Sequence, residues 1–277
     1  MRAAVVGHVE WIEFARVDHV PRPGEIVHAA QTWEKVGGGG SVAAVQLSKL
    51  ARESVFFTAL GEDRLGHRAE GDLESMGVRV EAVFRDTAQR RAFTHVDDRG
   101  ERTITVMGER LGPSGNDPLA WDLLDDTAAV YFTAGDLGAL QAARRARVVV
   151  ATSRVLPFLA EAGVPLDAVV GSGKDEAERY VPGALHPSPR LVVQTAGADG
   201  GTYQTADGRS GSFEAAPLPG PVVDAYGCGD SFAGGLTFAL GRGDEVEDAL
   251  VFAARCGAAC LTGRGPYAGQ LRLPELA

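Results

Sequence analysis

The feature that most constrains the fold is a repeated alternation of short apolar runs with segments of helical spacing. Apolar runs of strand length fall at residues 3–6, 54–59, 129–132, 147–151, 168–170 and 191–195. Helical spacing occurs at residues 41–50, 64–76, 139–146, 231–240 and 249–261. Buried strands that alternate with helices are typical of a mostly parallel sheet covered by helices on both faces. We therefore expect an α/β protein, a three-layer αβα sandwich, with a single domain over residues 1–277 because no linker or internal repeat interrupts the pattern.

Two segments depart from this rhythm and have the pattern of strands in a second sheet. Residues 25–35 are strand-like, and residues 91–106 predict a hairpin around an Asp- and Gly-rich turn. Such a hairpin can form a small β-sheet lid that projects from the main body. We place the lid segments at roughly residues 10–36 and 88–108. His95 and Arg91 on the hairpin would face either a substrate or solvent.

Charge and cysteine content exclude several classes of function. The 27 basic and 37 acidic side chains give a net charge of −10, which argues against a general nucleic-acid binder. No signal-peptide pattern and no run of about 18 apolar residues occurs, so we expect a cytoplasmic protein without a membrane partner. Three cysteines do not indicate a disulfide framework, and Cys256 and Cys260, four residues apart, favour a packed helix face over half of a metal site.

Arginine supplies 24 of the 27 basic side chains, because only Lys35, Lys49 and Lys174 are lysines. Together with abundant Ala and Gly, this ratio indicates codon bias. An individual arginine therefore carries no functional signal from its identity alone.

The sharpest local motif is a pair of glycines directly before a predicted helix, in the segment Gly227-Cys228-Gly229-Asp230. Glycine allows a tight turn and a close approach of the backbone to a ligand. The amides of Gly227, Cys228 and Gly229 would point out of a helix N-terminus, where the dipole favours an anion. Asp230 is either a helix cap or a base that removes a proton from an alcohol beside a phosphate. The residues alone leave both readings open.

Other glycine clusters fail the common nucleotide motifs. The segment Gly171-Ser-Gly173-Lys174 looks like the end of a P-loop, but Ala168 stands in place of the first glycine and Asp175 in place of Ser or Thr. No Gly-x-Gly-x-x-Gly opens a helix after the first strand. A Walker A loop and a dinucleotide fingerprint are both excluded.

As a set, the motifs resemble those of the ribokinase-like, or PfkB, carbohydrate kinases. Residues 224–235 are similar to the C-terminal signature Asp-Thr-x-Gly-Ala-Gly-Asp-x-Phe-x-x-Gly, with Cys228 in place of Ala. Residues 37–50 resemble the N-terminal glycine signature and its helix, and residues 58–66 the Gly-x-Asp-x-x-Gly turn. Residues 192–200 resemble the nucleotide-side Thr-x-Gly-x-x-Gly loop. The resemblance runs in order along nearly the whole chain.

This resemblance implies a ribokinase-like fold and an ATP-dependent transfer of phosphate to an alcohol of a sugar or sugar-like small molecule. Asp230 would be the catalytic base, and the amides of Gly227, Cys228 and Gly229 would form the anion hole. Positioning and electrostatics supply most of the rate in such a reaction. The residues implied to bind the acceptor are Glu10, Gly38, Gly39, Val42 and Asp230.

The same resemblance implies a nucleotide site and two cation sites. The nucleotide would contact Lys174, Thr195, Gly197, Gly200 and Gly229. Glu176 would hold Mg²⁺ through water, and Asp224 falls where the family often holds a monovalent cation such as K⁺. Read without the family, Glu176 is a capping acid and Gly197 and Gly200 are turn glycines. Relatives often dimerise through the lid, so a homodimer through the lid is a further expectation.

Three positions depart from the family pattern. Ile12 and Val42 stand where sugar-binding Asp and Asn are usual, and Gly173 replaces the Asn of Asn-x-x-Glu. A pocket without those polar groups gives up part of its discrimination. We therefore expect an acceptor that is not recognised as ribose is, with Glu10 as a replacement contact. A nucleoside or vitamin-precursor kinase, or a ligand-binding regulator that lost turnover, are the alternatives, and an unrelated α/β protein would leave most of the motifs unexplained.

Overall fold

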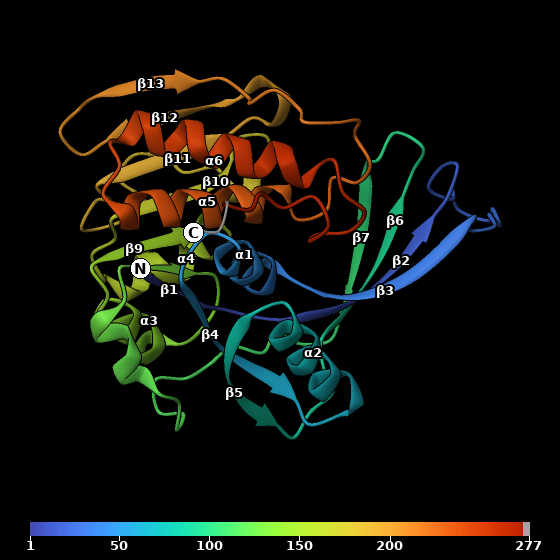
Figure 1. The fold of residues 1–277 in the computed structure, drawn as a ribbon, viewed down its shortest axis with the longest axis horizontal. Helices are drawn as coiled ribbons and strands as arrows, with labels where there is room; N and C mark the ends of the chain where they lie inside the picture. The colour runs from blue at the N-terminus through green and yellow to red at the C-terminus, as the bar shows by residue number, and fades with distance from the viewer. Residues whose placement is uncertain (274–277) are drawn as a thin grey trace.

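The computed structural model describes residues 1–273, and its architecture is the predicted three-layer α/β fold (Figure 1). A nine-stranded sheet has the order β13-β12-β11-β10-β9-β8-β1-β4-β5, and its first seven strands along the chain pair in parallel. Its strands are β1 (Arg2–Val6), β4 (Glu53–Gly61), β5 (Val78–Arg85), β8 (Ala129–Phe132), β9 (Val148–Thr152), β10 (Ala168–Ser172), β11 (Leu191–Thr195), β12 (Gly201–Thr205) and β13 (Ser210–Phe213). Every predicted apolar run coincides with one of these strands to within two residues at either end.

Helices cover both faces of the sheet. The helices are α1 (Gly39–Ser48), α2 (Arg64–Ser75), α3 (Leu137–Ala143), α4 (Leu156–Ala162), α5 (Cys228–Arg242) and α6 (Val246–Cys260). Side chains of α1, α2, α5 and α6 share one apolar core, and those of α3 and α4 share the other. Successive strand residues alternate between the cores, as Phe56 and Phe57 of β4 do. This separation is why the predicted strands are almost continuously apolar.

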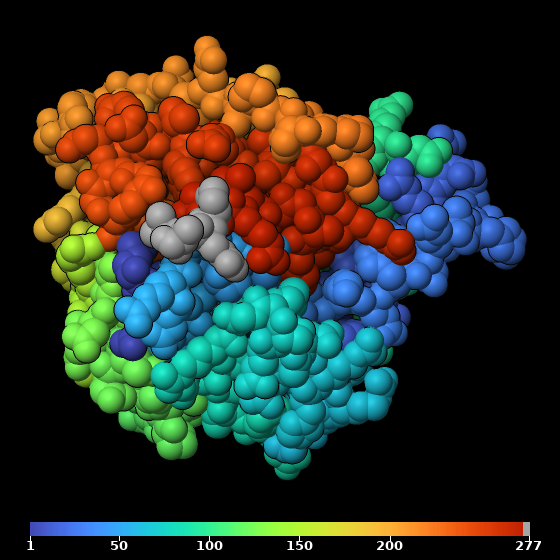
Figure 2. Space-filling model, in the orientation of Figure 1, coloured from blue at the N-terminus to red at the C-terminus, as the bar shows by residue number. Residues whose placement is uncertain are grey.

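A separate four-stranded sheet forms the lid, in the order β3-β2-β6-β7. Its strands are β2 (Glu10–Arg16), β3 (Gln31–Gly37), β6 (Arg91–Val96) and β7 (Arg102–Met107). Figure 2 shows this blue and green part projecting from one side of the main body. The predicted hairpin is formed by β6 and β7, with Arg91 opposite Met107. Residues 25–30, expected to be strand-like, lie in the loop before β3 instead.

Helix α4 and two strand regions of the main body were not expected from the sequence. The antiparallel strands β12 and β13 lie at the edge of the sheet, where their alternating exposure gives no continuous apolar run. Strand β5 is also an edge strand, with mixed polar and apolar residues. Edge strands carry weaker hydrophobic patterns because only part of each strand is covered.

Cys256 and Cys260 are buried on α6, as expected for a packed helix face. The Sγ of Cys256 lies 2.7 Å from where a Cβ on Gly235 would stand, so α5 and α6 pack closely at this point. Within residues 1–273, no group of three or more His, Cys, Asp or Glu side chains is arranged to hold a metal ion. None of the helices in this part of the chain is long and apolar enough to cross a membrane.

Candidate active site

The first turn of α5 carries the Gly-Cys-Gly-Asp motif. Gly227 is the N-cap residue with a φ of 83°, a backbone conformation that favours glycine. A Cβ there would also lie 3.0 Å from Val42 Cγ1. Gly229 faces open space, because a Cβ on it would meet nothing within 4 Å, whereas Asp230 is buried. The turn thus begins a helix at Gly227, leaves Gly229 exposed and holds one carboxylate beside it. A helix N-terminus of this kind favours an anion.

Asp230 makes no capping hydrogen bond in the described residues, because its carboxylate has Arg154 and no backbone amide of α5 as its partner. Its Oδ1 accepts a hydrogen bond from Arg154 Nη1 at 2.9 Å, and the pair is an ion pair. Arg154 lies in the short turn η2 (Ser153–Val155) that follows β9. The carboxylate of Asp230 raises the pKa of the Arg154 guanidinium above its ordinary value. The capping interpretation of Asp230 is therefore wrong, and its carboxylate is fixed by a cation instead.

Arg154 joins Asp230 to a second carboxylate. Arg154 Nε donates to Glu178 Oε1 at 2.7 Å, and Glu178 Oε2 accepts from the backbone amide of Ser172 at 2.9 Å. Glu178 lies in the turn η3 (Glu176–Glu178) after β10. Two acids from different elements, α5 and η3, thus share one guanidinium, whose planar fork suits two carboxylates.

The start of α1 lies directly against this pair. A Cβ on Gly39 would stand 2.8 Å from Asp230 Oδ1 and 3.4 Å from Arg154 Nη1. Gly38, the N-cap residue with a φ of 88°, lies on the other side, 3.0 Å from the amide nitrogen of Glu10 by the same measure. The two glycines form a floor without side chains between Asp230 and Glu10.

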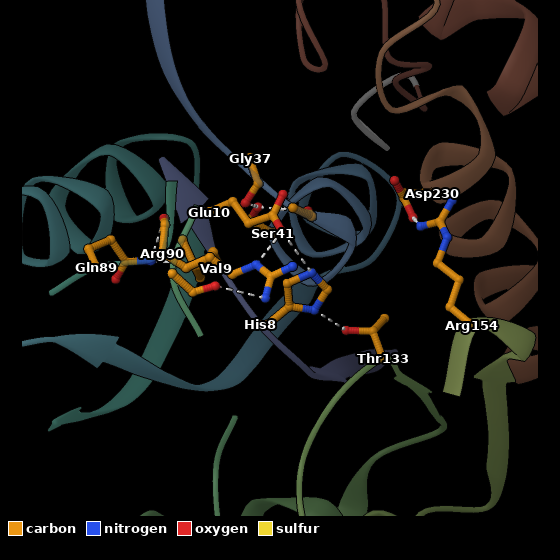
Figure 3. A network of polar contacts seen from close by, with 12 residues as sticks. His8, Val9, Glu10, Gly37, Ser41, Gln89, Arg90, Thr133, Arg154 and Asp230 are labelled. Carbon is orange, nitrogen blue, oxygen red and sulfur yellow. Dashed lines mark hydrogen bonds and ion pairs between the residues drawn. The ribbon is translucent and has the colours of Figure 1, made fainter. Parts of the chain in front are cut away.

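Glu10 forms a second ion pair, with Arg90, on the side of Gly38. Its Oε1 accepts from Arg90 Nε at 2.8 Å and lies 3.8 Å from His8 Nε2. Figure 3 shows Glu10, Arg90 and His8 on one side of the start of α1, with Asp230 and Arg154 on the other. Burial, followed by the charges of nearby arginines, holds the pKa of His8 well below its ordinary value. His8 is therefore neutral at pH 7.

The side chains at two predicted or family-typical acceptor positions are buried. Val42 and Ile12 have no exposed surface: each is 0% exposed. Val42 packs against Gly227, and Ile12 packs against Gly37. Val42 therefore offers no surface for the expected contact with a substrate, because apolar side chains at these two positions are part of the core.

The predicted nucleotide residues gather at the ends of β10 and β11. Lys174 pairs with Asp199 at 2.9 Å, both on the surface, and its Nζ lies 3.9 Å from where a Cβ on Gly197 would stand. Thr195 Oγ1 donates to the carbonyl of Gly171. Gly200 has a φ of 75° and a packing role, because a Cβ there would lie 1.9 Å from the carbonyl oxygen of Phe213.

The two predicted cation residues have different surroundings. Glu176 is exposed, and no ion pair involving it occurs in the described chain, whereas Glu178 is the acid that reaches Arg154. Asp224 is 1% exposed and accepts hydrogen bonds from the amides of Tyr226 and Gly265, at 2.8 and 2.9 Å. Asp224 thus ties the loop before α5 to the loop after α6, with no positive side chain on it among residues 1–273.

Comparison with known proteins identifies the family. Residues 2–161 and 158–272 match the model of the pfkB family of carbohydrate kinases. The chain belongs to this family. The ATP-dependent ribose-1-phosphate kinase of Halopiger xanaduensis is 30% identical to it, over 93% of this chain and 91% of that relative. The 2-dehydro-3-deoxygalactonokinase of Haloferax volcanii is 27% identical, over 90% of this chain and 89% of that relative.

Solved structures of pfkB relatives confirm the fold. The ribokinase of Thermotoga maritima superposes with a TM-score of 0.78 at 20% identity, over 98% of this chain and 96% of that one. The ribokinase of Arabidopsis thaliana, solved with ribose and ATP, has a TM-score of 0.72 at 18% identity, over 97% and 95% of the two chains. The predicted α/β fold with a small β lid, the family and the assignment as a carbohydrate kinase are thereby confirmed.

Sequence reasoning missed four residues that this pfkB kinase places around Asp230 and Glu10. They are Arg154, Glu178, Arg90 and His8. Three of these are charged residues in a chain where such residues are frequent, and each partner is distant in sequence. For Glu178 a signal existed, because it is a second acid close to Glu176, the residue that we assigned to the Asn-x-x-Glu-like segment.

Proposed function

We propose that this kinase transfers the γ-phosphate of ATP to an alcohol group of a sugar or sugar-like small molecule. The observation that carries the proposal is the position of Asp230, a buried carboxylate in the first turn of α5, next to the exposed Gly229 and held by Arg154. A carboxylate next to an anion-binding backbone is the pairing that an alcohol phosphorylation requires.

In this proposal the acceptor hydroxyl lies against Gly38 and Gly39 and gives its proton to Asp230. Its oxygen forms the new bond to the γ-phosphorus as the bond to the ADP oxygen breaks. The amides of Gly227, Cys228 and Gly229 stabilise the charge on the transferring phosphoryl group. Arg154 is a positioning residue that orients the Asp230 carboxylate toward the hydroxyl.

The nucleotide is proposed to lie on the side of Asp230 formed by the ends of β10 and β11. Lys174, Thr195, Gly197 and Gly200 come together there, and Gly229 faces open space from the α5 side. Support for ATP as phosphate donor comes from relatives, one of them a Cryptococcus neoformans ribokinase solved with ADP. The ribokinase of Arabidopsis thaliana was solved with ATP.

Mg²⁺ fits this site only as an ion carried largely by the phosphates. Mg²⁺ keeps several waters and takes one or two carboxylates together with substrate phosphates, where it neutralises charge during transfer. Since Arg154 occupies Asp230 and Glu178, the exposed Glu176 is the carboxylate proposed to hold the ion through water.

A monovalent cation, K⁺ in our proposal, would be held by Asp224. A buried carboxylate without a cation is costly, and two amide hydrogen bonds compensate only part of its charge. Bound there, the ion would stabilise the loop that leads into the anion hole.

The whole chain is proposed to act as one kinase domain that dimerises through its lid. Strand β7 is an exposed edge strand, with Ile104 39% and Val106 43% exposed. Exposed β-branched residues on a free edge favour pairing with a second copy. Light scattering at increasing protein concentration tests this part separately.

The test of the function is ADP release with Mg²⁺-ATP and K⁺ across neutral sugars, sugar phosphates, sugar acids and nucleosides. We expect turnover with at least one acceptor, and a loss of at least about 10³-fold in kcat for Asp230→Asn. Asp125→Asn, which changes an exposed acid paired with Arg145, is the matched control. An Asp230→Asn variant within tenfold of wild type would refute the base assignment, and binding without turnover would favour a regulator.

A further inference from the structure

The side chains around Glu10 carry more positive charge than is needed to neutralise its carboxylate, which already forms an ion pair with Arg90. Arg110 follows β7 and comes close to Arg90, because the base of the β6–β7 hairpin brings the two segments together. Arg90 Nη1 also donates to the carbonyl of Gly108 at 3.4 Å, two residues before Arg110. Arg90 thus pairs with Glu10, and Arg110 lies two residues beyond the carbonyl that Arg90 also contacts.

Arg110 has no acidic partner of its own. Among residues 1–273 its guanidinium makes no ion pair with Asp or Glu, while Glu10 is already engaged by Arg90. Burial and, after it, the positive charge of Arg90 lower the pKa of Arg110. Arg90 and Arg110 together carry +2 and Glu10 carries −1, so this cluster has a formal charge of +1 in a chain of net charge −10.

His8 adds no acid to balance that charge. His8 Nε2 lies 3.8 Å from Glu10 Oε1, and burial, followed by the charges of Arg110, Arg90 and Arg154, lowers the pKa of His8. Since His8 is held neutral, the cluster keeps one uncompensated guanidinium. Arg110 is exposed to solvent. A guanidinium with free donors is suited to a carboxylate or a phosphate.

The cluster lies at the acceptor end of the site and not at the nucleotide end. Gly38 is in contact distance of Glu10, and Gly39 of Asp230, so a molecule lying on these two glycines would span from the base to the arginines. The proposed nucleotide residues lie at the ends of β10 and β11, in the main sheet and not in the lid. The N-terminal dipole of α1 favours negative charge at the same place.

We propose that the acceptor is an anionic sugar, with a phosphate or carboxylate group remote from the hydroxyl that is phosphorylated. Arg110 binds that anionic group together with Arg90, and Glu10 accepts hydrogen bonds from the sugar hydroxyls. The inference rests on the proposed function, because it names the substrate class of the same site. It also accounts for the apolar residues at positions 12 and 42, since the arginines supply recognition that those positions do not.

The test uses acceptors in matched sets: each sugar as the neutral compound, as its phosphate monoester and as its sugar acid. Wild type should use an anionic member with a kcat/KM at least tenfold above that of the neutral sugar. Preference within the set distinguishes phosphate from carboxylate. Arg110→Gln should raise the KM for the anionic acceptor at least tenfold and leave the KM for ATP within twofold. Arg110→Lys should restore part of the loss.

Arg145→Gln is the control, because it removes an exposed arginine of the α3 side without touching the site. The inference is overturned if neutral sugars are used as well as their anionic counterparts, or if Arg110→Gln changes the KM for ATP alone. Neutral-sugar turnover that Asp230→Asn abolishes would leave the proposed function standing while removing this inference.

If no acceptor turns over, calorimetric binding of the same acceptors without ATP tests whether Arg110 binds their anionic group. Binding of an anionic acceptor to wild type that Arg110→Gln weakens at least tenfold supports the inference even then. Equal binding by the two proteins, or no binding of any anionic acceptor, overturns it.

Discussion

Two arginine–carboxylate pairs stand on either side of the start of α1, and they differ in what surrounds them. At Asp230, one guanidinium serves two carboxylates, because Arg154 also contacts Glu178. At Glu10, one carboxylate forms an ion pair with Arg90, a second arginine, Arg110, is close by, and the neighbouring His8 is neutral. An acid-rich end suits proton removal, and a cation-rich end suits the binding of an anion. The difference assigns chemistry to the first pair and recognition to the second.

The largest effect that can break this comparison is expected from Arg154→Gln. Without the guanidinium, the carboxylates of Asp230 and Glu178 repel each other and Asp230 loses its orientation. We expect kcat to fall by about 10²-fold while the acceptor KM changes little, since small displacements of a catalytic group cost that much. Steady-state kinetics should also show partial recovery in Arg154→Lys, which can contact one carboxylate at a time. A rise in KM with unchanged kcat would place Arg154 in recognition instead.

Gly39→Ala tests how closely the two ends share their floor. The new Cβ would stand 2.8 Å from Asp230 Oδ1, so the carboxylate must move. We expect kcat to fall by about 10-fold or more, with near-native thermal stability because alanine is favoured in a helix. Gly71→Ala, also in a helix but with open space around it, is the control for the same change. Equal kinetics in the two variants would show that Gly39 does not support Asp230.

The neutral state of His8 gives a pH dependence that sharpens the description of the cation-rich end. Because its folded pKa is depressed, the unfolded chain binds the proton first as the pH falls below about 6.5. This contribution is complete above that pH and is lost below it, at up to about 1.4 kcal/mol per pH unit. Denaturant unfolding at pH 7, 6 and 5 should show a shallower decline for His8→Gln than for wild type. The exposed His28→Gln should keep the wild-type decline, and identical profiles for all three would contradict the assignment.

The smallest expected effect comes from Gly71→Ala itself, away from both pairs. Gly71 is exposed in the interior of α2, and a Cβ there meets nothing within 4 Å. Alanine reduces the conformational entropy of the unfolded chain, so the free energy of unfolding should rise by about 0.4–1 kcal/mol. A thermal melt measures this, with kcat and both KM values unchanged. Any change in kinetics would mean that α2 influences the site.

The sequence predicted the fold and the acid-rich end better than the cation-rich end. Buried parallel strands and the glycines before Asp230 are local patterns, and a local pattern can be read from one segment. Arg154 reaches Asp230 across 76 positions and Arg90 reaches Glu10 across 80, and the high arginine content hides both. Glu178 was missed in favour of Glu176 because a one-turn helix decides which of two nearby acids points inward. Val42 was expected at the substrate, but its apolar side chain is buried in the core.

The most direct test of the division between the two ends measures Asp230→Asn and Arg110→Gln side by side with one anionic acceptor. Equilibrium binding of the acceptor and the single-turnover rate of phosphate transfer are determined for each protein. The predicted result is a lost transfer rate with retained acceptor affinity in Asp230→Asn, and weakened affinity with a retained rate at saturation in Arg110→Gln. If both substitutions change the same quantity to the same extent, the two ends do not have separate roles.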